Sequence, residues 1–366
     1  MTAVIAGLGS ALPGAAEQRV LWEEFFHRHF AQSRTARRIF AGAGVRRRHT
    51  VVNPLTEDVS GWSTATRMRR YTEEAWPLGH RAVTAAMAHA GITADDVGLL
   101  AVASCTGYST PGLDIQLAAS LELRPDTQRL LIGHMGCYAA LPALGSAADF
   151  VVARRRTAVL LCLELTSLHL QPPTNDPQQV VSHALFGDAA VALVLRPWAG
   201  VGPDARPPRL ELVDIAALTD PGTSDHMTWK ITDLGFRMEL SARVPDVLAE
   251  HVRPVVKDLL SRNGLDLPDV RGWAVHPGGP RILDTVQERL ALPAHTLAAS
   301  RTVLAEHGNC SSATLPLVLE EMLGSGVLSD GGGPVVAMAF GPGLTLYTAL
   351  LRAASGTRDT PVPPTL

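Results

Sequence analysis

The sequence contains few cysteines, and their spacing excludes two common uses of this residue. Only four occur in 366 residues, at positions 105, 137, 162 and 310. Four cysteines are too few for a scaffold held together by disulfides, and no two form the closely spaced pairs that bind structural zinc. We therefore expect a reduced, intracellular protein that holds no metal ion.

Charge is also scarce, and its balance excludes several kinds of partner. Charged residues make up 18% of the chain and leave a formal net charge of -3. A chain so close to neutral has no long-range attraction for nucleic acid or for an anionic membrane. Because no run of about 18 uncharged apolar residues occurs and the first residues do not resemble a secretory signal, we predict a cytoplasmic protein that does not enter membranes.

The chain is 46% hydrophobic, which is enough to bury a large core. Short apolar runs that suit buried strands lie at 3–7, 97–104, 158–164, 189–195, 209–216, 272–275, 333–340 and 344–351. Helical spacing marks the segments 76–91, 138–153, 244–263 and 313–323. Strands that are apolar on both faces and alternate with helices predict an α/β fold.

A connector rich in proline and glycine, at 196–208, divides the chain into two parts with the same alternation of strands and helices. We predict an N-terminal half at 1–200 and a C-terminal half at 209–352. The last segment, 353–366, is polar and rich in proline, which is typical of a disordered tail.

Cys137 is the first candidate for chemistry because it stands at the start of a predicted helix. The helix follows the apolar stretch LLIGHMG, and its unpaired N–H groups favour an ionised thiol, which is the nucleophilic form of cysteine. A free cysteine is as often a small buried hydrophobic residue. This feature alone supports the two interpretations equally.

His276 and Asn309 complete a set of residue types known from thiol chemistry. His276 ends a predicted strand and precedes a proline and two glycines, so it can project into a cleft, although most of the 13 histidines are ordinary loop residues. Asn309 precedes a predicted helix, where asparagine is usually a cap. Cysteine, histidine and asparagine form a recognised nucleophile pattern, but the signature of papain-like proteases is missing around Cys137.

Seven ordered motifs carry a resemblance to a known family. They are CTGYSTPGLD (105–114), GHMGCYAALPAL (133–144), LELTSLHLQPP (163–173), ALFGDAA (184–190), HPGGPRILD (276–284), GNCSSAT (308–314) and FGPGLT (340–345). Together they resemble the bacterial type III polyketide synthases, the chalcone synthase-like enzymes. The resemblance implies a thiolase fold, in which two similar halves form five αβαβα layers. It also implies that Cys137, His276 and Asn309 are the catalytic triad.

The resemblance further implies an acyltransferase that uses coenzyme A thioesters and needs no other cofactor. In this interpretation Cys137 takes an acyl starter from acyl-CoA, while His276 and Asn309 stabilise the enolate formed when malonyl-CoA loses carbon dioxide. A β-ketoacyl synthase III-like enzyme that takes substrates from acyl carrier protein shares this logic and is the alternative, as is a non-catalytic paralogue. The motifs at 184–190 and 340–345 favour the polyketide synthase.

The same resemblance assigns residues to the substrate pocket and to coenzyme A. The pocket residues are Phe186 and Met238, at two gatekeeper positions, with Cys105, Thr106, Thr110, Thr166, His169, Trp229 and Ser311, and the CoA-binding residues are Arg38, Gly278 and Arg281. Thr110 matches a residue that reaches into the partner subunit's pocket, which implies a homodimer. Thr106 and His169 are expected to offer polar groups to the growing chain.

Trp229 carries the prediction of product size. It falls near a position that is small in the plant enzymes, so its indole should narrow the cavity. We therefore expect about two or three extensions and a small pyrone, resorcinol- or phloroglucinol-type product.

Overall fold

A nine-stranded mixed sheet forms the centre of the computed structural model, which describes residues 1–198, 210–326 and 332–353. Its strands follow the order β11-β12-β13-β8-β1-β7-β6-β4-β5. Their bounds are β1 Thr2–Ala11, β4 Val97–Ala103, β5 Gln128–Ile132, β6 Thr157–Glu164, β7 Ala189–Trp198, β8 Leu210–Thr219, β11 Gly272–Val275, β12 Gly333–Gly341 and β13 Thr345–Ala353. Two small sheets pair β2 Ala15–Glu17 with β3 Arg47–His49, and β9 Met227–Thr232 with β10 Gly235–Leu240.

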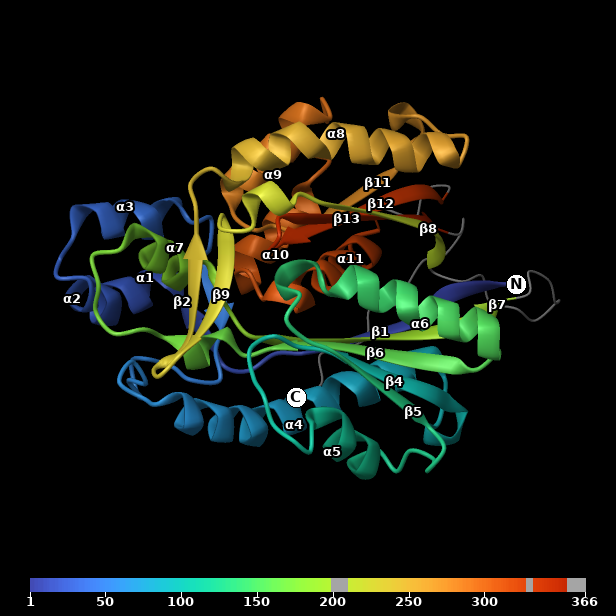
Figure 1. Cartoon of the computed structure of the whole chain (residues 1–366), viewed down its shortest axis with the longest axis horizontal. Helices are drawn as coiled ribbons and strands as arrows, with labels where there is room; N and C mark the ends of the chain where they lie inside the picture. The colour runs from blue at the N-terminus through green and yellow to red at the C-terminus, as the bar shows by residue number, and fades with distance from the viewer. Residues whose placement is uncertain (199–209, 327–331, 354–366) are drawn as a thin grey trace.

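The helices form three layers, with the two halves of the large sheet between them. They are α1 Gln18–Leu21, α2 His27–His29, α3 Arg34–Gly42, α4 Thr64–Ala90, α5 Leu113–Ser120, α6 Ala140–Arg154, α7 Pro177–Leu185, α8 Val244–Arg262, α9 Pro280–Arg289, α10 Ala298–His307 and α11 Thr314–Gly324. In Figure 1, α8 and α9 cover one half of the sheet, α4 and α5 cover the other, and α6 and α11 lie between the halves. The predicted five-layer αβαβα fold is thereby confirmed.

Three buried apolar clusters occupy the spaces between these layers. The central cluster joins α6 and α11 to the inner faces of both halves of the sheet. The second packs α4 against β4, β6 and β7, and the third packs α8 against β11, β12 and β13. Every residue of β4 and β6 is buried, as expected for strands with apolar runs on both faces.

The two halves of the sheet meet along a short junction. β1 pairs with β8 over only three residues, Ala3 to Ile5, whereas its pairing with β7 runs almost the whole strand. The central apolar cluster, which includes α6 and α11, also joins the two halves.

One helix boundary differs from the prediction. The segment predicted to begin at 76 is part of α4, which begins at Thr64 and contains Pro77. Its start is capped by the Ser63 hydroxyl, which accepts a hydrogen bond from the Thr66 N–H. The first turns carry mostly polar residues, and Arg67 and Tyr71 rather than aliphatic side chains form their buried face, so they lack the apolar periodicity on which the prediction depended.

The predicted connector and tail fall mostly outside the described residues. β7 continues to Trp198, so it takes in the first three residues of the connector predicted at 196–208. The rest of that connector, 199–208, is not part of the described structure. Of the tail predicted at 353–366, Ala353 is instead the buried last residue of β13, and 354–366 are not part of the described structure.

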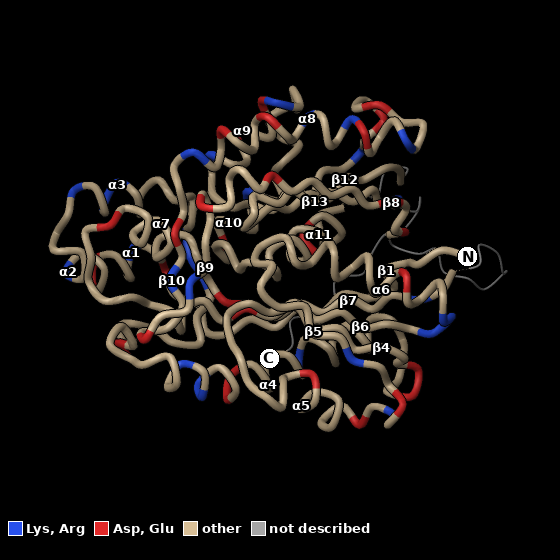
Figure 2. Tube along the Cα trace, viewed as in Figure 1, with Lys and Arg blue, Asp and Glu red and all other residues tan. Residues whose placement is uncertain are grey.

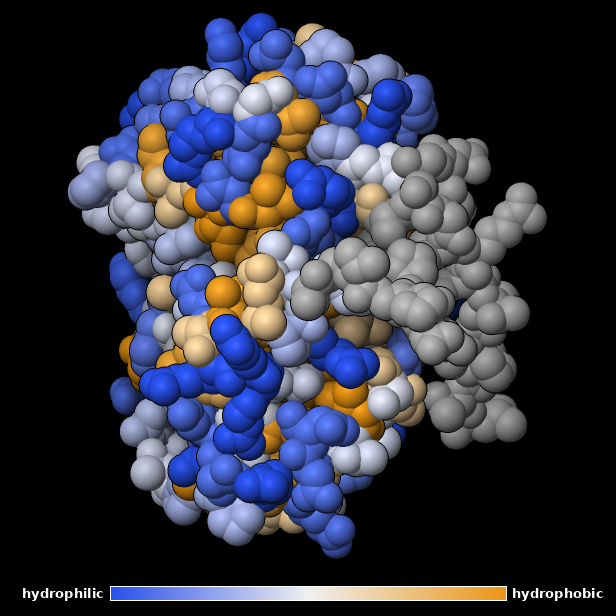
Figure 3. Space-filling model, turned by 90° about the vertical axis from the view of Figure 1, so that its right-hand side faces the viewer, coloured by the Kyte–Doolittle hydropathy of each residue, from blue (hydrophilic) through white to orange (hydrophobic). Residues whose placement is uncertain are grey.

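The surface shows no single dominant charge. Lysine, arginine and acidic residues are interspersed along the chain (Figure 2), and the side of the molecule shown in Figure 3 is mostly hydrophilic with separate hydrophobic patches. One helical segment, Gly136–Arg154, is long and apolar enough to cross a membrane, but 50% of its most apolar window is buried. It includes α6 of the central layer, so core packing accounts for its composition.

Candidate active site

Cys137 lies in η3, a 3-10 turn at Gly136–Tyr138 that leads directly into α6. The preceding Gly136 has a φ of 73°, and a Cβ there would lie 2.9 Å from the ring of Pro342, so the tight approach requires glycine. Cys137 is only 4% exposed. Burial raises the pKa of its thiol to about 12, against hydrogen bonds from Ser311, Asn309 and its own backbone, which lower it.

His276 follows β11 and projects from the end of that strand. Its backbone N–H donates to the Met338 carbonyl of β12 over 2.8 Å, and its ring meets Phe340 edge-on at 5.7 Å between centroids. Both ring nitrogens are buried, and neither has a hydrogen-bond partner among the residues that the structure describes. Burial lowers the pKa of His276 to about 3, so the free imidazole is neutral.

Asn309 is held rigidly between α10 and α11. Its backbone N–H donates to the Leu185 carbonyl over 2.8 Å, and its carbonyl accepts from the Gly187 N–H over 3.0 Å. The side-chain Oδ1 accepts from the Ser311 N–H over 2.9 Å. Because Oδ1 is engaged in this way, the amide NH₂ is the group left to face Cys137.

These three side chains line one cavity of about 790 Å³. All three residues predicted to bind coenzyme A line the same cavity: Arg38 on α3, Gly278 just before α9 and Arg281 in its first turn. Phe186 and Met238 line it as well. The three buried side chains thus share a large cavity with the exposed Arg38 and Arg281.

A much smaller cavity of about 20 Å³ is also lined by Cys137. Trp229 closes it, and the indole Nε1–H donates to the Cys105 carbonyl over 2.8 Å. This hydrogen bond joins β9 to the Cys105 loop. The other lining residues are Thr106, Gly136, Thr166, Phe186, Met238, Ser311 and Pro342.

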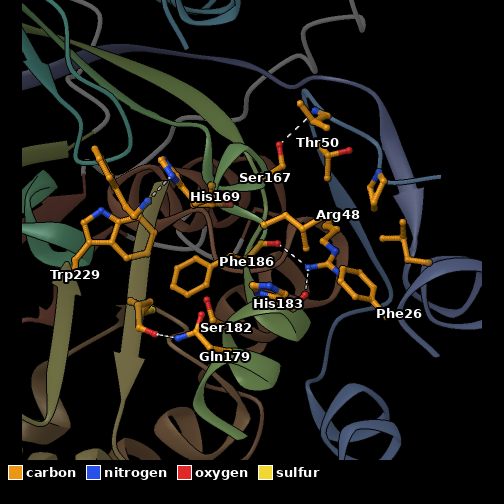
Figure 4. Close-up of a pocket in the computed structure, with 17 residues that line it drawn as sticks. Phe26, Arg48, Thr50, Ser167, His169, Gln179, Ser182, His183, Phe186 and Trp229 are labelled. Carbon is orange, nitrogen blue, oxygen red and sulfur yellow. Dashed lines mark hydrogen bonds between the residues drawn. The ribbon is translucent and has the colours of Figure 1, made fainter. Parts of the chain in front are cut away.

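A third cavity, of about 60 Å³, has Trp229 and Phe186 in its wall (Figure 4). Trp229, Phe186, Met238 and Thr166 line both this side cavity and the 20 Å³ cavity, so these residues form the partition between the two. The other residues that line the 60 Å³ cavity are His169, Ser167, Gln179, Ser182, His183, Phe236, Leu170, Leu21, Phe26, Arg48, Thr50, Val52 and Pro54.

The expectation that Thr106 and His169 offer polar groups to a growing chain is wrong. The Thr106 hydroxyl donates to Glu164 over 2.8 Å and accepts from the Leu165 N–H over 2.9 Å. His169 Nδ1 accepts from the Phe236 N–H over 2.9 Å, which leaves Nε2 protonated to donate to the Thr106 carbonyl at 2.7 Å. Both side chains support the wall, and their hydrogen-bonding groups are already occupied.

The sequence did not indicate a role for Glu164, although this residue binds several groups in the wall of the 20 Å³ cavity. It ends β6, is fully buried, and accepts hydrogen bonds from the Cys105 N–H, the Thr106 hydroxyl and the Ser312 hydroxyl. Burial raises the pKa of this carboxyl group, and the same donors lower it. The available signal was a single acidic residue at the end of an otherwise apolar strand, which rarely occurs without hydrogen-bond partners.

The small sheet formed by β9 and β10 carries both Trp229 and Met238, which are cross-strand partners. Side chains attach this hairpin to the rest of the pocket. Gln171 donates to the Leu234 and Phe236 carbonyls over 3.1 and 3.2 Å, and Gln179 donates to the Met238 carbonyl.

Thr110 is the one predicted pocket residue that lines none of these three cavities. It is exposed on the loop before α5, where its hydroxyl lies 3.3 Å from that of Tyr108. The role predicted for it requires a second subunit.

A buried thiol, imidazole and carboxamide around one cavity of a thiolase-like fold define a class, the acyltransferase-type condensing enzymes. Within that class the chain belongs to the chalcone and stilbene synthase family. The model of the family's N-terminal domain matches residues 2–198, and that of its C-terminal domain matches residues 211–355. The protein is therefore a type III polyketide synthase, an enzyme of decarboxylating Claisen condensation.

Relatives and solved structures agree with this assignment. The chain is 34% identical to "Alpha-pyrone synthesis polyketide synthase-like Pks18" of Mycobacterium tuberculosis, over 84% of this chain and 80% of the relative. It is also 34% identical to a 1,3,6,8-tetrahydroxynaphthalene synthase of Streptomyces peucetius, over 86% of this chain and 83% of that one. The structure of 1,3,6,8-tetrahydroxynaphthalene synthase from Streptomyces coelicolor superposes with a TM-score of 0.88 at 27% identity, covering 96% of this chain and 99% of that one.

Proposed function

We propose that Cys137, His276 and Asn309 act as the catalytic triad of this polyketide synthase. The observation that carries the proposal is the convergence of a thiol, an imidazole and a carboxamide on one cavity that continues outward to exposed arginines. The Cys137 sulfur attacks the acyl-CoA carbonyl, coenzyme A leaves as its thiol, and the starter remains as a thioester on Cys137.

Proton transfer within the triad explains how a buried thiol becomes nucleophilic. Loss of the proton to solvent would leave an uncompensated charge in an apolar site, which is why the pKa of Cys137 is high. Transfer of the same proton to His276 instead leaves a net-neutral pair. His276 is therefore the base for acylation, and it passes the proton to the departing coenzyme A sulfur.

Condensation uses the neutral forms of His276 and Asn309 as hydrogen-bond donors. Loss of carbon dioxide from malonyl-CoA places an electron pair on the thioester enolate, whose oxygen accepts hydrogen bonds from the imidazole and the carboxamide. The enolate carbon then attacks the acyl carbon on Cys137, and the Cys137 sulfur leaves. The chain grows by two carbons on coenzyme A and returns to Cys137 for the next cycle.

The first test is the site of acylation. Brief incubation with an acyl-CoA followed by peptide mass spectrometry is expected to find the acyl group on Cys137, because only this cysteine is positioned with His276 and Asn309. Cys162, buried in β6, is the internal control and should remain unmodified. An adduct on Cys105, Cys162 or Cys310 would contradict the assignment.

We further propose that the enzyme makes small products from short starters with about two or three extensions. The space beyond Cys137 supports this, since the two inner cavities measure only about 20 and 60 Å³. Arg38, Gly278 and Arg281 are proposed to hold coenzyme A in the outer cavity, where positive charge suits its phosphates. The match of both halves to the chalcone and stilbene synthase models favours CoA thioesters over acyl carrier protein as the substrate carrier.

We propose that the enzyme works in the cytoplasm as a homodimer that pairs through β5. This strand is the outer edge of the large sheet, and four of its five residues are exposed. Leu130 and Leu131 are 38% and 51% exposed, with Ile115 at 43% and Tyr108 at 64%. An exposed edge strand with apolar side chains invites pairing with another strand, and the Thr110 loop lies beside it.

The Leu131→Arg variant is expected to be largely monomeric, because it places a charge in the middle of the proposed interface. Light scattering during gel filtration at micromolar concentration measures the mass. Val152→Arg changes another exposed apolar residue, on α6, and should remain dimeric. A monomeric wild-type protein would refute the proposed dimer.

A further inference from the structure

A buried arginine, Arg48 of β3, lies against the segment that carries the gatekeeper Phe186. Arg48 is 4% exposed, and its guanidinium group lies over the ring of Phe26, 5.5 Å from the ring centroid. Burial lowers its pKa to about 10 and Asp188 opposes this shift, so the group remains a cation at neutral pH. A permanently charged group in such a site has to make specific contacts to offset its desolvation.

Those contacts converge on the C-terminal end of α7. The Arg48 Nη1 donates to the carbonyls of His183 and Phe186, the latter over 2.9 Å, as Figure 4 shows. Carbonyls at a helix C-terminus lack partners within the helix, and a cation there is favoured by the helix dipole. The other nitrogens, Nε and Nη2, have no partner within the described part of the chain, so these two carbonyls take the hydrogen bonds of the group.

The same segment also holds Asn309. The residues on either side of Phe186 make the two backbone hydrogen bonds that fix it, from the Asn309 N–H to Leu185 and from the Gly187 N–H to Asn309. The backbones are in direct contact here, because a Cβ on Gly187 would lie 2.4 Å from the His307 carbonyl. A shift of the Leu185–Gly187 backbone therefore shifts Asn309.

We infer that Arg48 is a positioning residue for the decarboxylation and condensation steps, acting through Phe186 and Asn309. Phe186 lines all three cavities, so its position decides how the outer cavity communicates with the two inner ones. Arg48 touches none of the three triad residues directly. Cys137 lies on η3, a separate element, so loading of the starter depends less on Arg48. This inference rests on the proposed roles of Cys137 and Asn309.

The test compares two steps in three variants. Arg48→Met keeps the length of the side chain but removes its charge and donors, and Arg48→Lys restores the charge with a single donor group. We expect Arg48→Met to lower malonyl-CoA decarboxylation by about 10- to 100-fold, as small misplacements of catalytic groups do, while acylation of Cys137 changes by less than about threefold. Arg48→Lys should recover part of the decarboxylation rate.

Arg67→Met is the matched control. Arg67 is also fully buried, its pKa is also lowered to about 10 by burial, and it donates to the carbonyls of Ser60, Trp62 and Leu168. It makes no hydrogen bond with the Leu185–Gly187 segment in the described part of the chain. We expect the Arg67→Met variant to lose thermal stability, as Arg48→Met does. Its ratio of the decarboxylation rate to the acylation rate should stay at the wild-type value.

The rates of the two steps in these variants distinguish a positioning role of Arg48 from a purely structural one. An equal loss of both steps in Arg48→Met, or a changed ratio in Arg67→Met as well, would show that Arg48 only stabilises the fold and would overturn the inference. If Arg48→Met does not fold, the ratio in Arg48→Lys decides, and a wild-type ratio there also overturns it. Failure of the wild-type enzyme to acylate Cys137 or to decarboxylate malonyl-CoA would instead refute the proposed function.

Discussion

The Asn309→Ala variant is expected to lose malonyl-CoA decarboxylation by about 10²- to 10³-fold, because removing one donor from an oxyanion-binding site costs that much. The donor is well fixed here, since Oδ1 is engaged by the Ser311 N–H and the backbone is bonded on both sides. The rate is measured as carbon dioxide released from malonyl-CoA in the absence of a starter.

Acylation of Cys137 provides the control for this variant. Asn309 acts on the enolate in the proposed mechanism, so the alanine variant should still form the Cys137 adduct seen by mass spectrometry. Asn309→Asp, which has the same size but replaces the donor with a carboxylate, should be at least as slow. Wild-type decarboxylation in either variant would remove Asn309 from the mechanism.

The Trp229→Gly variant is expected to lengthen the products or to admit bulkier starters. The indole is part of the partition between the cavities of about 20 and 60 Å³, so its removal joins them and adds the volume of the side chain. A longer chain can then remain attached to Cys137 before it cyclises. Mass spectrometry of the products from a panel of acyl-CoA starters measures the change in chain length.

Trp229→Phe is the matched control for volume. It keeps an aromatic ring in the partition but loses the hydrogen bond from Nε1 to the Cys105 carbonyl. We expect its product lengths to stay close to those of the wild type. If Trp229→Gly makes the same products from the same starters, the indole does not limit chain length.

The strands, and the grouping of Cys137, His276 and Asn309 at one cavity, could be predicted because their signals are local. Runs such as those of β4 and β6 are apolar at every position, and burial on both faces follows from that pattern alone. The motifs around Cys137, His276 and Asn309 are likewise contiguous in sequence. The structure brings all three to one cavity although they come from different parts of the chain.

The wall of the pocket could not be predicted because it depends on contacts between distant segments. The Trp229 indole meets the carbonyl of Cys105, 124 residues away in the chain. His169 is engaged by Thr106 on one side and by Phe236 on the other, which no local pattern indicates. Arg48 lies in the three-residue strand β3 and Glu164 at the end of β6, and only the fold shows which groups they bind.

The attachment of the β9–β10 hairpin suggests how this enzyme can diversify. The hairpin carries Trp229 and Met238 but forms a sheet of its own, joined to the pocket wall by the side chains of Gln171, Gln179 and His169. Substitutions on the cavity face of the hairpin therefore alter the shape of the pocket without breaking any hydrogen bond of the nine-stranded sheet. Selection for a new product, in evolution or in directed mutagenesis, can act on this small unit while the triad and the core remain unchanged.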